Sequence, residues 1–446
     1  MKKYILLPLL AMSFPIVSIA QNVHAMDVNP LASISKNNLK FSVGGRFAMD
    51  GAYIKSEYSP VNSGVAISDA RVRTSLSVGE NWFFTADFDF AYNQFEQKNL
   101  FGQYLWNNSW VKLGYFCEPS SMNLNTSRFN LHFINRPGVV NALGQGRSIG
   151  LAYKYGNNLF YANQGIFSEN EYNDQANGSQ GFAASGRWLI KPLNNDNATL
   201  HIGGTFRYAT LQTGKFEDGV LHRDLTIGTT LENNVYTPIE FLNTIVPWAS
   251  SEMNISVEAL AMTKKVFVRG EYLMKRIGRD RNDQRLFENQ LGGMYSWGTL
   301  ESWQNANPLK TINFNGGYVE AGVILKGDKY EYDNDNSVLK GLSGKNNIEL
   351  VGRYNYTNLN DITEGDFYFD ANDKFYPNFD GSIPDFPTGS SSIAGGAMHS
   401  FTLGLNYGVN NYIKVMLDYT HSILDNVRYS YDKNFSILQT RVMVVF

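Results

Sequence analysis

Between Lys40 and Tyr53 the chain reads KFSVGGRFAMDGAY, with apolar residues or glycine at odd positions and mostly polar residues at even positions. Successive side chains of a strand point to opposite faces, so this period of two predicts a strand with one apolar face. The same alternation is clearest again at 65–78, 84–92, 200–208, 266–274, 350–356, 401–407 and 413–419. It is weaker near 100–106, 109–115, 149–155, 159–167, 181–190, 254–261, 317–325 and 435–446. The sequence therefore predicts about 16 strands.

The connections between these segments fall into two classes. Short turn-type clusters occupy 79–81, 107–108, 156–158, 194–197 and 408–411. Long polar connections cover 117–148, 209–253, 276–313, 326–347 and 358–396. Short turns at one end and long loops at the other are typical of an antiparallel outer-membrane β-barrel. We expect the short turns in the periplasm and all the long connections at the extracellular end.

Charged residues fall almost entirely on one face of the predicted strands. A charge on the lipid face near mid-bilayer costs roughly 2–4 kcal/mol, so a barrel wall in lipid requires this separation. Aromatic residues at strand ends, such as Tyr53, Trp82 and Tyr419, fit the interfacial belts of such a wall. The alternative is a soluble β-sandwich or propeller, which would have shorter strands and more even connections.

The N-terminus has the layout of a secretory signal peptide. The basic residues Lys2 and Lys3 precede an apolar run over 4–19, and small residues precede a predicted cut after Ala20. A second candidate cut follows Ala25. The alternative is an uncleaved anchor helix, which the shortness of the run and its prolines disfavour.

The C-terminus ends in a strand pattern, RVMVVF at 441–446. An aromatic last residue, Phe446, resembles the sorting signal of bacterial outer-membrane barrels. The predicted organisation is a signal peptide at 1–20, a short segment at 21–38 and an outer-membrane barrel over 39–446.

The composition excludes several classes of protein. The 446 residues hold 38 Lys and Arg against 41 Asp and Glu, a balance that argues against nucleic-acid binding. The single cysteine, Cys117, excludes a disulfide framework and a cysteine-based zinc site. The six histidines show neither ligand nor triad spacing, and no G-x-S-x-G motif occurs. We therefore expect no enzyme, no metal and no cofactor.

Several segments, taken in order, resemble the phosphate-selective porins O and P. They are FSVGGRF at 41–47 with Asp50, ARV at 70–72 with WFF at 82–84 and DFD at 87–89, VKLGYF at 111–116 with Glu118-Pro119, Thr126-Ser127 and Asn135-Arg136, GEY at 270–272 and GLNY at 404–407. The resemblance runs from about residue 39 to 446. It implies a 16-stranded trimeric porin that passes anions through an arginine-lined constriction.

Three positions, at two places in the chain, depart from this resemblance. Family members commonly carry two arginines just before the Ala-Arg of the second strand, where this chain has Ser68 and Asp69. The lysine often found before Glu-Pro is Cys117 here. Both changes remove positive charge near the expected eyelet, so phosphate selectivity is the part of the resemblance that they weaken.

The candidate selectivity residues are arginines. By strand parity or by their place in the 117–148 connection, the pore-lining candidates are Arg46, Arg71, Arg73, Arg128, Arg136, Arg147, Arg207 and Arg269. A fixed positive charge in a narrow pore offsets the hydration that an anion loses, and the planar guanidinium can hold two oxygens of phosphate. The alternative is that these charges pair across strands and only solvate the wall.

The 117–148 connection is the candidate constriction, because it follows the fifth predicted strand, where porins fold a loop into the barrel. It carries Arg128, His132, Arg136 and Arg147 and no acid after Glu118. A plain surface loop is the alternative. The 209–253 connection is a second candidate for folding inward or for stabilising a trimer.

The sequence thus predicts an all-β porin of the bacterial outer membrane that passes small hydrophilic solutes passively, with an anion bias and with phosphate as a candidate solute. The expected partners are small anions or other small solutes, outer-membrane lipid and the other copies of a homotrimer. A non-selective diffusion porin and a structural or adhesin barrel with a plugged lumen are the alternatives. We expect Arg46, Arg71 and Arg136 at the narrowest zone.

Overall fold

A computed structural model gives the fold of the chain. It describes residues 31–57, 61–169, 179–211, 214–216, 219–221, 223–279, 310–342, 344–363, 368–369, 375–376, 392–426 and 433–446. The predicted signal peptide at 1–20 lies outside the described residues, as do parts of four of the long connections. Within the described residues, no helix has the length and apolar character needed to cross a membrane.

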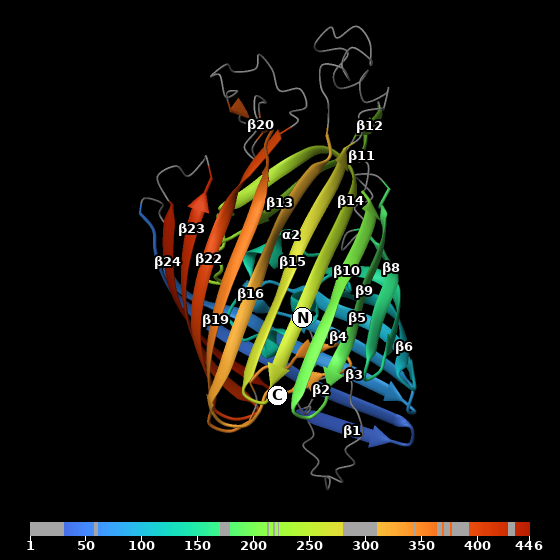
Figure 1. The fold of residues 1–446 in the computed structure, drawn as a ribbon. Coiled ribbons are helices and arrows are strands. Elements are labelled where there is room, and N and C mark those ends of the chain that lie inside the picture. Colours follow the sequence, from blue (N-terminus) through green and yellow to red (C-terminus); the bar gives the residue numbers. More distant parts are fainter. Residues whose placement is uncertain are drawn as a thin grey trace, which may run out of the picture.

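Sixteen of the 20 strands in the main described sheet form a closed antiparallel barrel (Figure 1). These wall strands are β2 (Leu39–Lys55), β3 (Gly64–Val78), β4 (Trp82–Asp89), β5 (Glu96–Trp106), β6 (Ser109–Cys117), β7 (Arg147–Gly156), β8 (Phe160–Ser168), β9 (Phe182–Asn194), β10 (Ala198–Thr210), β14 (Leu242–Thr263), β15 (Val266–Arg279), β16 (Ile312–Lys326), β19 (Asn347–Asp361), β22 (Ser392–Gly408), β23 (Ile413–Asp425) and β24 (Asn434–Val445). The predicted fold class and strand number are confirmed.

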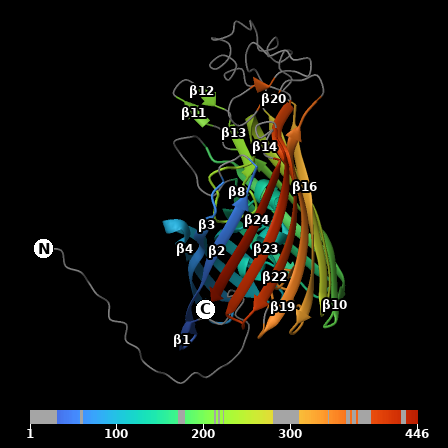
Figure 2. The same ribbon diagram turned by 90° about the vertical axis from the view of Figure 1, so that its left-hand side faces the viewer.

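The barrel closes between its first and last wall strands. In Figure 2 the blue β2 runs beside the red β24, and their register extends from Arg46 opposite Val445 to Lys55 opposite Ser436. Below this seam, Gly45 and Phe446 exchange two backbone hydrogen bonds, of 2.6 and 3.0 Å. A side chain at Gly45 would meet the Phe446 ring at 2.9 Å, so the close approach requires glycine. The strand β1 (Ala32–Lys36) continues the pairing on the lower end of β2.

The two faces of the wall differ as the alternation predicts. On β2, Arg46, Ala48 and Asp50 point inward and are at most 5% exposed. Phe47 and Met49 alternate with these residues, are 39% and 47% exposed, and point out of the barrel. Inward charges and outward apolar side chains are what a wall in lipid needs.

One predicted strand is shorter than its pattern. The alternation over 84–92 predicted a strand to Tyr92, whereas β4 ends at Asp89. The Asp89 carboxylate accepts the backbone N–H groups of Ala70 and Ala91, which replaces ladder hydrogen bonds. The chain then turns into a short 3₁₀ helix, η1 (Ala91–Asn93), with Tyr92 at a φ of 56°.

The long connections do not all lie at one end, and the prediction for 326–347 is wrong. Strand β16 runs toward the short-turn end, so the segment 327–346 that follows it starts there, and it folds upward into the barrel. Its two short strands are β17 (Tyr332–Asp333) and β18 (Val338–Leu339). The prediction was wrong because it used the length of the connection alone. A long connection at the short-turn end is compatible with a barrel when its side chains can be buried inside.

The remaining described elements belong to the other connections. They are the helices α1 (Met122–Asn125) and α2 (Gly138–Leu143), the 3₁₀ helix η2 (Arg128–Asn130), and the strands β11 (Gly214–Phe216), β12 (Gly219–Leu221), β13 (Arg223–Thr229), β20 (Tyr368–Phe369) and β21 (Phe375–Tyr376).

Candidate functional site

The connection between β6 and β7 lies inside the barrel and is fixed at its start by a wall residue. Ser121 caps α1 by accepting the backbone N–H groups of Asn123 and Leu124. The Glu271 carboxylate on β15 accepts from the Ser121 hydroxyl at 2.9 Å and from the backbone N–H of Met122 at 2.7 Å. An inward carboxylate on the far wall therefore holds the first turn of this segment.

The rest of that segment is tied to the last strands of the wall. Asp418 accepts the backbone N–H of Ile134 at 2.7 Å, and the Lys414 ammonium donates to two backbone carbonyls, at 2.6 and 2.9 Å. His132 and Glu349 lie 2.7 Å apart, with no exposure of either side chain. Segment 118–146 is thus anchored to the β15–β24 side of the barrel.

A second connection enters from the same end. Glu232, in the segment between β13 and β14, pairs with Arg353 of β19 and accepts the backbone N–H of Gly138 at 2.9 Å. Its backbone carbonyl accepts a hydrogen bond from the Asn135 amide. Part of the 209–253 connection therefore lies inside the barrel, packed against the first.

The segment 327–346 fills the short-turn end of the same side. Arg187 of β9 donates to the backbone carbonyls of Asn336 and Ser337, both at 2.7 Å. The Tyr330 hydroxyl donates to Glu349, and the backbone N–H of Gly341 donates to Asn130 of the segment above. Three connections thus meet and occupy one half of the lumen.

The open space lies in the other half, along β2–β8. It is a cavity of about 1010 Å³ whose lining extends from Asn234, before β14, to Asn107 and Asn108, in the turn between β5 and β6. Among the described residues, nine basic and two acidic residues line it. The basic ones are Arg46, Arg71, Arg73, Lys112, Arg128, Arg136, Arg147, Lys154 and Lys340, and the acidic ones are Asp333 and Asp335.

Six of the eight predicted arginines line this cavity, and three of them are paired with carboxylates. Arg46 donates to Asp69 at 2.7 Å, and Arg73 donates to Asp87 at 3.0 Å. Arg71 lies 3.3 to 3.5 Å from Asp69, Asp87 and Asp89. The positive charge of these three arginines is therefore largely compensated.

The other three arginines of the lining, Arg128, Arg136 and Arg147, have surroundings that differ from those of Arg46, Arg71 and Arg73. Arg136 donates to the carbonyl oxygens of Asn123 and Thr126, and Arg147 donates to the Asn99 amide oxygen at 3.2 Å. Within the described part of the chain, neither has a carboxylate within 4.0 Å, whereas Arg128 lies 3.9 Å from Asp69. Burial lowers the pKa of Arg136 to about 9 and that of Arg128 to about 10, and both still carry charge at neutral pH.

The remaining two predicted arginines lie away from the open space. Arg207 bonds Glu118 and Glu252, each at 2.9 Å, and Arg269 bonds Glu320 at 2.7 Å. Both are 1% exposed and are absent from the lining of this cavity. They face inward as parity predicts, but the connections that fill that half cover them.

The sequence analysis did not select Lys340, Asp333 and Asp335, because it placed 326–347 outside the barrel. Counting strands would have found them, since the connection after an even-numbered wall strand lies at the short-turn end. The described residues contain no group of three or more His, Cys, Asp or Glu side chains that could hold a metal ion.

Comparison with known proteins agrees with this architecture. A family model, phosphate-selective porin O and P, matches residues 41–446. The anion-selective porin from Comamonas acidovorans is 12% identical, with a TM-score of 0.52 over 92% of this chain and 100% of that one. The outer-membrane protein OmpT of Vibrio cholerae is 10% identical, with a TM-score of 0.51 over 93% and 99%. At these identities the solved structures establish the fold alone. No curated protein matches the sequence.

Proposed function

The chain belongs to the phosphate-selective porin O and P family, and we propose that its pore prefers anions because of Arg136 and Arg147. It is a porin of the bacterial outer membrane, through which small hydrophilic solutes diffuse passively. We propose that it acts only as a channel and not as an enzyme.

The observation that carries the proposal is the unequal pairing of the lumenal arginines. Asp69, Asp87 and Asp89 compensate the arginines of β2 and β3, whereas Arg136 and Arg147 have only neutral acceptors among the described residues. An uncompensated guanidinium beside a narrow aqueous path attracts anions and repels cations. In this proposal phosphate binds beside Arg136 and Arg147, because the guanidinium fork suits its oxygens.

We further propose a homotrimer that covers the β4–β8 wall. Strand β4 has 8 residues and β6 has 9, against 22 in β14. Eight residues tilted by about 40° rise roughly 20 Å, which is less than the apolar band of about 25 Å on a barrel in lipid. A neighbouring subunit would shield the ends of so short a wall.

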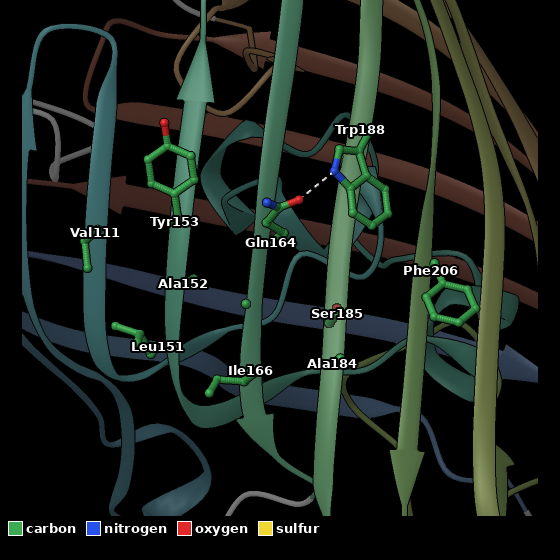
Figure 3. A pocket seen from close by; sticks show the side chains of 11 residues that line it. Val111, Leu151, Ala152, Tyr153, Gln164, Ile166, Ala184, Ser185, Trp188 and Phe206 are labelled. Carbon is green, nitrogen blue, oxygen red and sulfur yellow. Dashed lines mark hydrogen bonds between the residues drawn. The ribbon is translucent and has the colours of Figure 1, made fainter.

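An outward groove beside this wall supports the same proposal. Figure 3 shows Leu151, Ile166, Trp188 and Phe206 around it, with the Trp188 indole donating to Gln164 at 2.9 Å. The small residues Ala184 and Ser185 form its floor. Such a groove fits the side chains of another subunit.

We also propose that residues 1–20 are removed on export and that Phe446 acts in sorting to the outer membrane.

The experiment is single-channel recording of the purified protein in a planar bilayer, first in a KCl gradient and then with phosphate added. A reversal potential on the anion side, with block by phosphate, supports the proposal. Conductance without selectivity or block would indicate a general diffusion porin, and no conductance would favour a structural barrel.

A further inference from the structure

The cavity wall near the short-turn end carries a cluster of side chains that the proposed anion path does not use. Lys112 and Trp110 lie on β6, Gln103 on β5, Lys154 on β7 and Asn163 on β8, and all five line the cavity. In the strand register Gln103 lies opposite Lys112, Trp110 opposite Lys154, and Lys154 opposite Asn163. Five neighbouring positions thus present two ammonium groups, two amides and an indole to one space.

The Lys112 ammonium is held by aromatic rings. It lies 4.4 Å from the ring centroids of Phe101 and Trp110 and 5.2 Å from that of Phe116. Among the described residues no carboxylate lies within 4.0 Å of it. Cation–π contacts position an ammonium without neutralising it, so its charge remains available to an anion.

The second ammonium is only weakly compensated. Lys154 lies 3.8 Å from Asp335, whose side chain is half exposed, in the segment that enters from the short-turn end. Lys154 itself is buried, but the separation is long and Asp335 is half exposed at the cavity, so an anion in the cavity can compete with Asp335 for Lys154.

The two amides have unused hydrogen-bonding capacity. Asn163 is 6% exposed, and its amide oxygen is buried with no partner in the described structure. Gln103 is 7% exposed beside Lys112. A buried amide without a partner is costly, and a hydroxyl donor would satisfy it.

We propose that these residues form a binding subsite for a sugar that carries a phosphate or a carboxylate. The lysines hold the anionic group, the amides bond hydroxyls, and the apolar face of the sugar ring packs on Trp110. Inorganic phosphate can bind the lysines but has no apolar face that could pack on the Trp110 indole. This inference rests on the proposed anion path, because the ligand must first pass Arg136 and Arg147.

The test is the residence time of solutes in the open channel, read from current fluctuations of the full-length protein in planar bilayers. We expect glucose 6-phosphate and glucuronate to remain longer than inorganic phosphate, and glucose to cause no resolved block. The variant Trp110→Ala should shorten the glucose 6-phosphate residence about fivefold, since an aromatic contact is worth about 1 kcal/mol. It should shorten the phosphate residence less, because phosphate does not contact the indole and is affected only through the Lys112 ammonium that the ring positions.

Two variants separate this effect from misfolding. Trp110→Phe keeps a ring and should retain most of the glucose 6-phosphate residence. Trp106→Ala removes an indole that contacts the Tyr104 and Tyr153 rings and does not line the cavity, and it should change the residence of no solute.

Equal residence of glucose 6-phosphate and phosphate in the wild type would overturn the subsite, as would an unchanged residence in Trp110→Ala. If the wild-type reversal potential is on the anion side while either result occurs, only the subsite fails. If that potential is not on the anion side, the proposed function itself fails.

Discussion

The two halves of the barrel carry the same types of inward-facing residue, but these residues have different roles in each half. Along β9–β24, buried ion pairs such as Arg207 with Glu118 and Arg353 with Glu232 attach two inward connections to the wall, and hydrogen bonds from Arg187 hold the third. Along β2–β8 the lumen stays open, and Arg136 and Arg147 face it without a carboxylate among the described residues. In our proposal, an inward arginine acts on permeating ions only where no connection packs over it and no carboxylate pairs with it.

The largest expected effect comes from breaking the buried pair that Arg441 of β24, in the filled half, makes with Asp50 of β2 across the seam. Arg441→Met leaves Asp50, which is 1% exposed, without the partner it bonds at 2.6 and 2.7 Å, and removes a bond to the Ile134 carbonyl. Removing one partner of a buried pair destabilises by about 3–5 kcal/mol. Unfolding in guanidinium followed by tryptophan fluorescence measures the change.

The matched control lies in the open half. The Arg73 side chain is 21% exposed, and its buried partner Asp87 keeps Arg71 at 3.5 Å and the Asn99 amide at 2.8 Å, so Arg73→Met should lower the free energy of unfolding by only about 1 kcal/mol. Equal losses in the two variants would contradict the division of the barrel into a filled and an open half.

The next effect concerns selectivity. Arg136→Glu exchanges an uncompensated positive charge for a negative one, which should lower the anion-to-cation permeability ratio about tenfold. The reversal potential in a KCl gradient reports this ratio. The control is the double variant Arg46→Gln/Asp69→Asn, which removes a pair without changing net charge and should leave the potential unaltered. An unchanged potential in Arg136→Glu would remove that residue from the ion path.

Cys117 gives a smaller and reversible version of the same test. It is the single cysteine of the chain and lines the cavity, at the end of β6 opposite Arg147. A methanethiosulfonate reagent bearing a sulfonate should lower the anion preference about threefold, and one bearing a trimethylammonium should raise it, because each adds one unit of charge to the lumen. A Cys117→Ser channel must not respond. Identical effects of both reagents would mean that charge at this position does not control selectivity.

The smallest expected effect is that of pH. Burial lowers the pKa of Arg136 to about 9, so its charge persists below that pH and begins to fall only near it. The reversal potential should therefore stay constant between pH 5 and 7 and decline at alkaline pH, where the lysines of the lining and then Arg136 lose their charge. A decline between pH 6 and 7 would instead assign the preference to a histidine.

Much of this architecture follows from the sequence. The alternation over 40–53 predicted both the strand and its inward face, because burial in lipid enforces a period of two. The same rule could not separate Arg207 from Arg71, which lines the open cavity. Both face inward, but what covers Arg207 is decided by contacts with Glu118 and Glu252, which are 89 and 45 residues away in the chain.

The misplaced segment 327–346 has a similar cause. Its polar sequence resembles an exposed loop, and its burial depends on partners far away in the chain, such as Arg187 and Asn130. Those partners are visible only once the barrel is closed. The early end of β4 likewise has a local cause, because the Asp89 carboxylate accepts the backbone N–H of Ala91. The alternation of polar and apolar residues gives no sign of this hydrogen bond.

The most direct test of the account is the reversal potential of Arg136→Gln/Arg147→Gln in a KCl gradient, recorded beside that of the wild type. If the uncompensated arginines carry the anion preference, the double variant should lose most of it and keep its conductance steps. If the double variant keeps the wild-type potential, the preference arises elsewhere and the central claim is wrong.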